Sequence, residues 1–216
     1  MPSNVFQVRI RGDLACFTRP EFKTERVSYD LITPSAARGV LEAVLWKPAI
    51  FWSVRRIMLL APVRFTQFKR NEVNSRANTQ AARSASRGGP IPDDFFAGDD
   101  RAQRGTMALR DVDYAVEAEI VLTPRAGPED NLRKFEEMFE RRLERGQFHM
   151  QPYLGCREFP AIVEPYTGTP PPLAGETRPL GFMLHDIRFA PGRNEAVFFA
   201  ARLRNGAVDV PEWRPA

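Results

Sequence analysis

The chain contains only two cysteines and two histidines among its 216 residues, which leaves few side chains that could bind a transition metal. Cys16 and Cys156 lie far apart, form no CxxC motif and belong to no Cys/His cluster. A structural zinc site needs four such ligands at close spacing, and multi-histidine metal enzymes need more histidines than this chain has. We therefore expect no metal site and no disulfide, in a protein of the cytoplasm, where thiols stay reduced.

Long apolar runs and nucleotide-binding motifs are also absent. No stretch approaches the roughly 18 apolar residues of a membrane span, and the N-terminal segment lacks the hydrophobic part of a signal peptide. Neither GxxxxGK[ST] nor GxGxxG occurs in the sequence. The sequence predicts a cytoplasmic protein that has no contact with a membrane and needs no cofactor.

Lysine is scarce, so arginine supplies nearly all of the 31 basic residues that face 27 acidic ones. The resulting net charge of +4 is compatible with an anionic partner but does not require one. A guanidinium can bind two phosphate oxygens at once, which favours a nucleic-acid partner. Because a GC-rich genome also raises the arginine content, both interpretations stay open.

Strands and amphipathic helices alternate along the chain. Residues 5–11 alternate apolar and polar side chains, which predicts a strand that ends at Gly12 and Asp13. One helix is predicted to start after Thr33 as its N-cap and to stop by Lys47, because Pro48 follows. A second helix is predicted over residues 129–145. The further strands are predicted at residues 50–61, 110–122, 157–164, 181–189 and 196–204, and the strand at 50–61 is expected to pair either with 63–68 or with 110–122.

This order of strands and helices predicts an α+β fold of the ferredoxin-like, RNA-recognition type. We assign it to residues 1–146 and expect residues 147–216 to form a small antiparallel β-rich appendage. Residues 69–105 show no periodicity, which predicts a long loop. Within residues 69–87, five basic side chains face one acid, Glu72. The loop is either a solvated surface segment or an arm that becomes ordered on a phosphate backbone.

Several motifs give the chain a likeness to one family. They are WKP at 46–48, ALRDV at 108–112 and QPYLGCREF at 151–159. In these motifs and their order the chain resembles, from end to end, the CRISPR-associated Cas-five family, d subfamily, of type I-C systems. The resemblance implies a metal-independent endoribonuclease that cuts the CRISPR repeat in precursor RNA. It also implies that the protein stays on the 5′ handle of the crRNA with other subunits of a surveillance complex. Whether double-stranded DNA is bound as well stays open.

Cleavage of this kind uses the ribose 2′-OH as nucleophile, so the protein must supply a base, an acid and a cation for the phosphate. Members of the family usually carry a Tyr just before Trp-Lys-Pro and a Lys-His pair in the second helix. This chain has Leu45, Lys134 and Phe135 at those positions. We therefore predict catalytic roles for Lys134, for His149 in the loop after the second helix, and for Tyr29 in a family motif. The alternative is an RNA-binding structural subunit in which Leu45, Phe135 and Tyr29 only pack.

RNA binding is predicted for a larger set of side chains. Most are basic residues of the first strand, of the turn after it and of the long loop, and one is an aromatic residue on which an unpaired base could stack. The set comprises Arg9, Arg11, Arg19, Lys23, Trp46, Arg76, Arg101, Arg104 and Arg110. The second histidine, His185, lies on an apolar strand and is predicted to be a packing residue.

Overall fold

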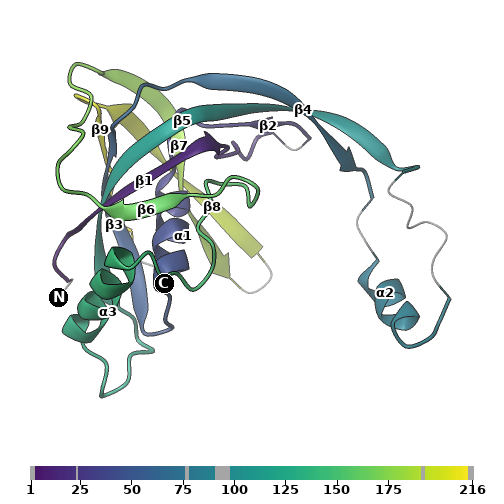
Figure 1. The fold of residues 1–216 in the computed structure, drawn as a ribbon, viewed down its shortest axis with the longest axis horizontal. Coiled ribbons are helices and arrows are strands. Elements are labelled where there is room, and N and C mark those ends of the chain that lie inside the picture. Colours follow the sequence, from purple (N-terminus) through teal and green to yellow (C-terminus); the bar gives the residue numbers. More distant parts are fainter. Residues whose placement is uncertain (1–2, 23, 76–77, 91–97, 191–192, 214–216) are drawn as a thin grey trace.

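The computed structural model describes residues 3–22, 24–75, 78–90, 98–190 and 193–213. Within these residues the chain forms one seven-stranded sheet, one separate hairpin and three helices (Figure 1). The elements are β1 (Phe6–Ala15), β2 (Arg26–Val27), α1 (Pro34–Val44), β3 (Ile50–Leu59), β4 (Phe65–Val73), α2 (Thr79–Ala85), β5 (Arg101–Leu122), α3 (Leu132–Glu144), β6 (Ile162–Pro165), β7 (Arg178–Ala190), β8 (Arg193–Leu203) and β9 (Ala207–Asp209).

The strands of the body of the sheet follow the order β6–β1–β5–β3–β9, and all of these neighbours are antiparallel. β3 pairs with the second half of β5, which decides between the two partners that the sequence left open. The prediction of an α+β protein is confirmed, and the sheet is mostly antiparallel. β1 does not stop at Gly12 as predicted but continues to Ala15, because Gly12, Leu14 and Ala15 stay paired with β5. Leu154 and Pro160 lie so close to Gly12 that a Cβ there would clash.

One face of this sheet carries α1, α3 and the hydrophobic core. Phe6 of β1, Trp52 of β3 and Phe139 of α3 meet there, with ring centroids 4.5–5.8 Å apart. The alternation of β1 places Phe6, Val8 and Ile10 in this core and turns Arg9 to the opposite face, as the period of two predicts.

The two helices of the body begin at side-chain caps. Thr33 Oγ1 accepts a hydrogen bond from the Ala36 N–H at 3.2 Å, and Pro34 follows in the first turn, as predicted. α3 begins at Leu132 rather than 129, because Asn131 is its cap and Asp130 closes the preceding turn on the Gly127 N–H at 3.0 Å.

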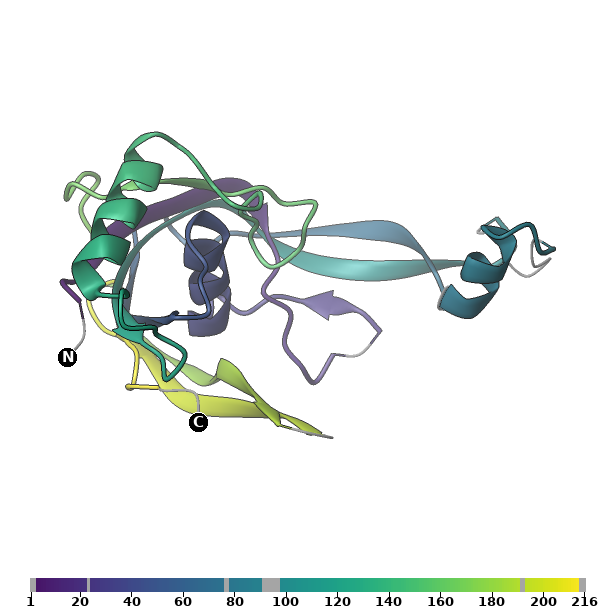
Figure 2. The same ribbon diagram turned by 90° about the horizontal axis from the view of Figure 1, so that it is seen from below.

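A long arm extends from the body, and it replaces most of the predicted loop at 69–105. Residues 65–73 of β4 pair with residues 101–109 of β5, and α2 lies at the far end (Figures 1 and 2). In β4, exposed residues alternate strictly with half-buried ones. The half-buried positions include Arg70 and Glu72, which form an ion pair at 3.1 Å. The prediction of a structureless loop was wrong because polar side chains take most of these positions, so the strand shows no hydrophobic period in the sequence.

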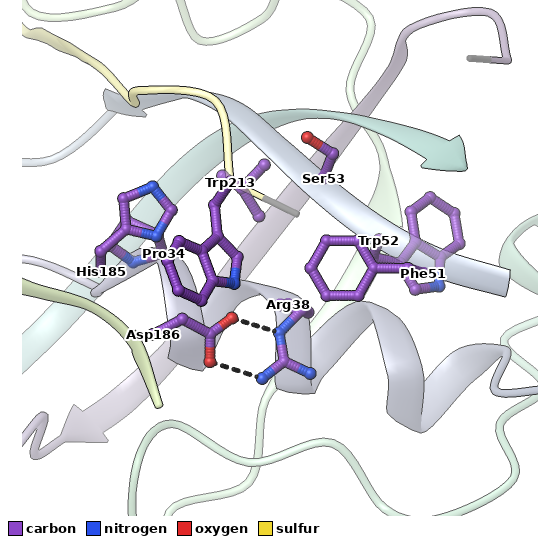
Figure 3. Close-up of a pocket in the computed structure, with 9 residues that line it drawn as sticks. Pro34, Arg38, Phe51, Trp52, Ser53, His185, Asp186 and Trp213 are labelled. Atoms are coloured by element: carbon purple, nitrogen blue, oxygen red, sulfur yellow. Dashed lines mark hydrogen bonds and ion pairs between the residues drawn. The ribbon is translucent and has the colours of Figure 1, made fainter. Parts of the chain in front are cut away.

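The residues expected to form a β-rich appendage contribute to the central sheet as well. β6 pairs with β1, and β9 pairs with β3. Only β7 and β8 form a hairpin of their own, which packs against α1. There the Arg38 guanidinium donates to both carboxylate oxygens of Asp186, at 2.9 and 2.8 Å (Figure 3).

His185 lies beside this ion pair and is buried, which confirms it as a packing residue. Its Nε2 is 2.8 Å from the Pro211 carbonyl oxygen. Its ring is 5.4 Å from the ring of Phe199 and 5.7 Å from that of Trp213.

Candidate functional site

Lys134 lies in the first turn of α3 with an exposed ammonium group. Its Nζ is 3.0 Å from Asp130 Oδ1 and 5.5 Å from the centre of the Phe135 ring. Hydrogen bonds from the Gly127 N–H and from Lys134 lower the pKa of Asp130. A solvent-exposed pair of this kind contributes little to stability, so a phosphate can take the place of the carboxylate. Lys134 is therefore positioned where it can bind an anion.

Tyr29 is 1% exposed and belongs to the core. The Arg19 guanidinium lies 4.4 Å from the centre of its ring. Burial raises the pKa of the phenol, although the backbone of Leu184 and the charge of Arg19 oppose this. The predicted role of Tyr29 in proton transfer therefore finds no support in its position, which instead suits the alternative that it packs.

His149 lies in the exposed segment that follows α3. Its backbone N–H donates to the Ala43 carbonyl oxygen at 2.7 Å, which attaches this segment to the last turn of α1. The imidazole is exposed and can exchange protons with a bound substrate.

The three predicted catalytic residues do not form a cluster. Lys134 is at the start of α3 and His149 is beyond its end, and the rise of a helix puts about 15 Å between Lys134 and Glu144. Among the described residues, no hydrogen bond or ion pair joins the side chains of Tyr29, Lys134 and His149. Any RNA that uses both Lys134 and His149 must span the length of α3.

The two positions at which the chain departs from the family pattern belong to the core. Leu45 and Phe135 are 0% and 2% exposed. Leu45 is the C-cap of α1, and its carbonyl oxygen accepts a hydrogen bond from Trp52 Nε1 at 3.0 Å. Neither side chain can transfer a proton, and neither faces solvent.

Several arginines that we predicted to bind RNA are already paired with carboxylates. Arg9 is 2.6 Å from Asp113 and 3.1 Å from Glu164, and the hydrogen bond with Asp113 raises the pKa of its guanidinium. Arg11 is 3.3 Å from Glu164. The face of the sheet opposite the helices is therefore a network of ion pairs rather than an open basic surface.

The remaining RNA-binding candidates differ in their surroundings. Arg19 is 3.4 Å from Asp30, and Arg104 is 3.4 Å from Glu72. Arg101 and Arg110 are exposed, and no ion pair links either of them to a carboxylate in the part of the chain that the structure describes. Trp46 is 50% exposed. Lys23 and Arg76 lie outside the described residues.

The QPYLGCREF segment lies at the base of the arm. Arg26 Nη1 donates to Cys156 Sγ at 3.1 Å, and Arg26 Nη2 is 3.3 Å from Glu72 of β4. Arg70 of β4 is 2.6 Å from Glu158. These contacts assign the motif a structural role, which is to fasten the segment at 151–159 to the arm.

Two buried cysteines form part of this fastening. Both thiols are free. A hydrogen bond with Cys16 and the guanidinium of Arg26 lower the pKa of Cys156, while the same pairing with Cys156 raises the pKa of Cys16. Gly155, with a φ of 81°, lets the segment pass so close to the Cys16 carbonyl that any Cβ would clash. The fold thus brings together two cysteines that lie 140 positions apart in the sequence.

Sequence reasoning missed two cations, Lys47 and Arg125. Both line a groove of about 480 Å³ beside Trp46, between the end of α1 and the end of β5. Lys47 belongs to the WKP motif, which could have drawn attention to it. Arg125 follows a strand within a turn, and nothing in its sequence surroundings distinguishes it from other exposed arginines.

In the described part of the chain, no cluster of three or more His, Cys, Asp or Glu side chains is arranged to hold a metal ion. Among the same residues, no helix is both long enough and apolar enough to cross a bilayer.

Exposed cations next to an exposed aromatic residue, on a mostly antiparallel α+β framework, define a candidate nucleic-acid-binding protein. Residues 5–211 match the model Cas_Cas5d, described as CRISPR-associated protein (Cas_Cas5). The chain belongs to this family, which confirms the resemblance seen in its motifs.

Two relatives are similar over nearly their whole length, and each is named CRISPR pre-crRNA endoribonuclease Cas5d. The protein from Mannheimia succiniciproducens is 45% identical over 98% of this chain and 96% of its own. The protein from Thermus thermophilus is 44% identical over 95% of this chain and 90% of its own.

Two solved structures share the fold at low sequence identity. One, described as a CRISPR-associated protein, has a TM-score of 0.71 at 20% identity and covers 98% of this chain and 93% of its own. The other is the functionally uncharacterized protein SMU1763c from Streptococcus mutans, with a TM-score of 0.69 at 21% identity over 100% of this chain and 94% of its own.

Proposed function

We propose that this chain is an endoribonuclease that cuts the CRISPR repeat in precursor RNA without a metal ion. It then stays on the 5′ handle of the crRNA as a subunit of a type I-C surveillance complex in the cytoplasm. The observation that carries this proposal is the identity of 44–45%, over nearly the whole chain, to two relatives named for pre-crRNA cleavage.

The topology supports the RNA-binding part of the proposal. The order β6–β1–β5–β3, with α1 between β1 and β3 and α3 between β5 and β6, has the connectivity of a ferredoxin-like domain. We propose that the body of the chain is such a domain. Its arm, which carries Arg101 on β5 and Arg83 on α2, extends from it toward the RNA.

Two side chains are accessible for the chemistry. Lys134 would exchange Asp130 for the scissile phosphate and stabilise the negative charge that develops on it. His149 lies beyond the other end of α3, so it is an alternative centre: if the scissile phosphate binds there, its imidazole would take up or deliver the proton that moves between the 2′-OH and the leaving 5′-oxygen. Tyr29, being buried, would act through Arg19, whose guanidinium stacks on its ring, rather than by proton transfer.

A second function is favoured by one observation. Leu45 and Phe135 are buried and apolar at the two positions where the family usually has proton-transferring side chains. The chain could therefore bind the handle as a structural subunit without cutting the repeat.

The deciding experiment is to incubate the purified protein with its own repeat hairpin in EDTA. Under our proposal one specific cut appears, and the upstream fragment carries a 2′,3′-cyclic phosphate or its hydrolysis product. Loss of the cut in only one of Lys134→Ala and His149→Ala would show which end of α3 holds the scissile phosphate. A cut that requires Mg²⁺ would contradict the mechanism, and tight binding without any cut would establish the structural alternative.

A further inference from the structure

The groove beside Trp46 has fixed walls. α1 ends at Val44, the chain turns through Trp46, Lys47 and Pro48, and it enters β3 at Ile50. Thr123, just after β5, closes the other side: its Oγ1 donates to the Pro48 carbonyl oxygen at 2.6 Å, and its N–H donates to that of Ala49 at 2.9 Å. The groove is thus present before any ligand arrives. Its volume of about 480 Å³ lies within the roughly 300–1,000 Å³ of small-ligand sites.

One wall of the groove is an aromatic surface in contact with solvent. Trp46 is 50% exposed, whereas Trp52, six residues further on, is 1% exposed and part of the core. Phe51 also lines the groove and is half-buried. An indole ring that the core does not use can stack on an unpaired base, whatever the identity of that base.

The charge of the groove has one sign. Its lining contains Lys47 and Arg125 and no carboxylate. Both side chains are exposed, and among the described residues no carboxylate lies within ion-pair distance of either of them. This distinguishes them from Arg9 and Arg11, which are both paired with Glu164. Two uncompensated cations beside an indole ring are complementary to the phosphates and the base of a nucleotide.

One turn of the chain joins the groove to the candidate catalytic lysine. Arg125 lies in this turn, in which the Ala126 N–H donates to the Thr123 carbonyl oxygen at 3.0 Å and the Gly127 N–H donates to Asp130 at 3.0 Å. Asp130 in turn holds Lys134 at 3.0 Å.

We propose that this groove binds one unpaired nucleotide of the repeat RNA. The base stacks on Trp46, and the flanking phosphates bind Lys47 and Arg125. The inference rests on the proposed function, since it takes the occupant to be the RNA that the chain binds. It goes further by assigning a particular subsite, beside the turn that leads to Lys134, to a nucleotide that does not pair. A protein segment is the less fitting occupant, because the lining contains two cations and no carboxylate.

The test measures binding of a repeat hairpin that cannot be cut because the scissile nucleotide lacks its 2′-OH. Trp46→Ala should weaken binding by roughly 5- to 150-fold, the range for loss of one base–aromatic stack. Trp46→Phe should restore most of the affinity. The double variant Lys47→Gln with Arg125→Gln should lower the slope of log affinity against log salt by about 1.4, since each single-strand phosphate contact accounts for about 0.7.

Matched controls use exposed residues far from the groove in the sequence. Phe182→Ala removes an aromatic side chain that is 73% exposed, and Arg202→Gln removes an exposed cation. Both should leave affinity and salt slope unchanged. Thermal unfolding of every variant is measured in parallel, and because Trp46, Lys47 and Arg125 are exposed, we expect the fold to survive.

A set of hairpins, each with one abasic position, then identifies the nucleotide. At one unpaired position the missing base should weaken binding to the unaltered protein but not to Trp46→Ala, since the stack is already lost. If no position behaves in this way, the stacking proposal is wrong.

The outcomes separate this inference from the proposed function. Unchanged affinity in the groove variants, together with normal cleavage in EDTA, would overturn the groove and leave the endoribonuclease in place. Weakened binding in a protein that never cuts would support the groove and contradict the endoribonuclease. If Trp46→Ala binds RNA normally but fails to assemble with the other subunits, the groove is a protein contact and our inference is wrong.

Discussion

The outer face of the central sheet and the groove beside Trp46 both carry cations. The cations of the sheet are paired with carboxylates, and those of the groove are not. On the sheet, Arg9 and Arg11 share Glu164, and Arg9 binds Asp113 as well. In the groove, Lys47 and Arg125 have no such partner among the described residues. The number of arginines in a segment therefore does not identify a phosphate site. What identifies it is the absence of a carboxylate within reach.

The arm belongs with the groove in this comparison. Arg83 and Arg87 line a second hollow at its far end, together with Gln80, Ser84 and two glycines, and no acid takes part in that lining. No residue of α2 is buried. A short helix with no buried residue gains little stability from packing, so a partner that contacts Arg83 and Arg87 would stabilise it.

The largest expected effect is on the rate of RNA cleavage, when acid–base groups are introduced at Leu45 and Phe135. Replacing Leu45 with Tyr and Phe135 with His restores the pattern of the family around Lys134. If the RNA is already held in register, a positioned acid–base pair should raise the rate of cleavage by about 10² to 10⁴. Single-turnover cleavage of the repeat hairpin in EDTA measures this.

The double variant also changes two core positions. An unsatisfied polar group there costs about 1–3 kcal/mol, so thermal unfolding must be measured together with cleavage. A folded variant that cuts no faster than the unaltered protein would show that other residues carry the chemistry.

The next largest effect should come from the arm. Replacing residues 74–88 with a short flexible linker removes three arginines, Arg76, Arg83 and Arg87. Affinity for the repeat should fall, and the salt slope should decrease by about 2 if each arginine binds one phosphate. The body should keep its unfolding temperature, because α2 contributes nothing to the core. Unchanged affinity and slope would assign the arm to a protein partner.

A smaller effect is expected on the salt dependence of RNA binding when an unpaired cation and a paired cation are each replaced. Lys47→Gln should lower the salt slope by about 0.7 without changing stability. Arg9→Gln should leave the slope unchanged, because its charge is already compensated. It should instead destabilise the fold by about 1 kcal/mol, since Asp113 and Glu164 lose their partner. Equal effects of the two substitutions on RNA binding would remove the distinction between the two surfaces.

The smallest effect is a pH dependence of stability at the base of the arm. The folded chain lowers the pKa of Cys156 through Cys16 and Arg26, so it releases this proton at a lower pH than the unfolded chain does. Stability should therefore rise as the pH increases toward the ordinary thiol pKa of about 8.5, and this gain should disappear as the pH falls through the lowered pKa. Urea unfolding in the presence of a reductant should show this rise in the unaltered protein and not in Cys156→Ser. Arg26→Gln should reduce it.

What the sequence determined by itself is carried by local patterns. Thr33, Pro34 and Pro48 delimit α1 because caps and prolines act on neighbouring backbone groups. The alternation in β1 and in the second half of β5 predicts strands because one face of each is buried. The WKP and QPYLGCREF motifs indicate the family, which the comparison over residues 5–211 confirms.

What only the tertiary structure decided depends on residues that are distant in the sequence. Arg9 meets Glu164 across 155 positions, so neither its neighbours nor its strand could reveal that its charge is compensated. Tyr29 is buried by elements that include β7, and its position in a motif could not distinguish packing from catalysis. The arm could not be predicted because its half-buried face carries the ion-paired Arg70 and Glu72, so no hydrophobic period appears in the sequence. The groove beside Trp46 exists only because Thr123 bonds to Pro48 and Ala49 and brings Arg125 next to Lys47.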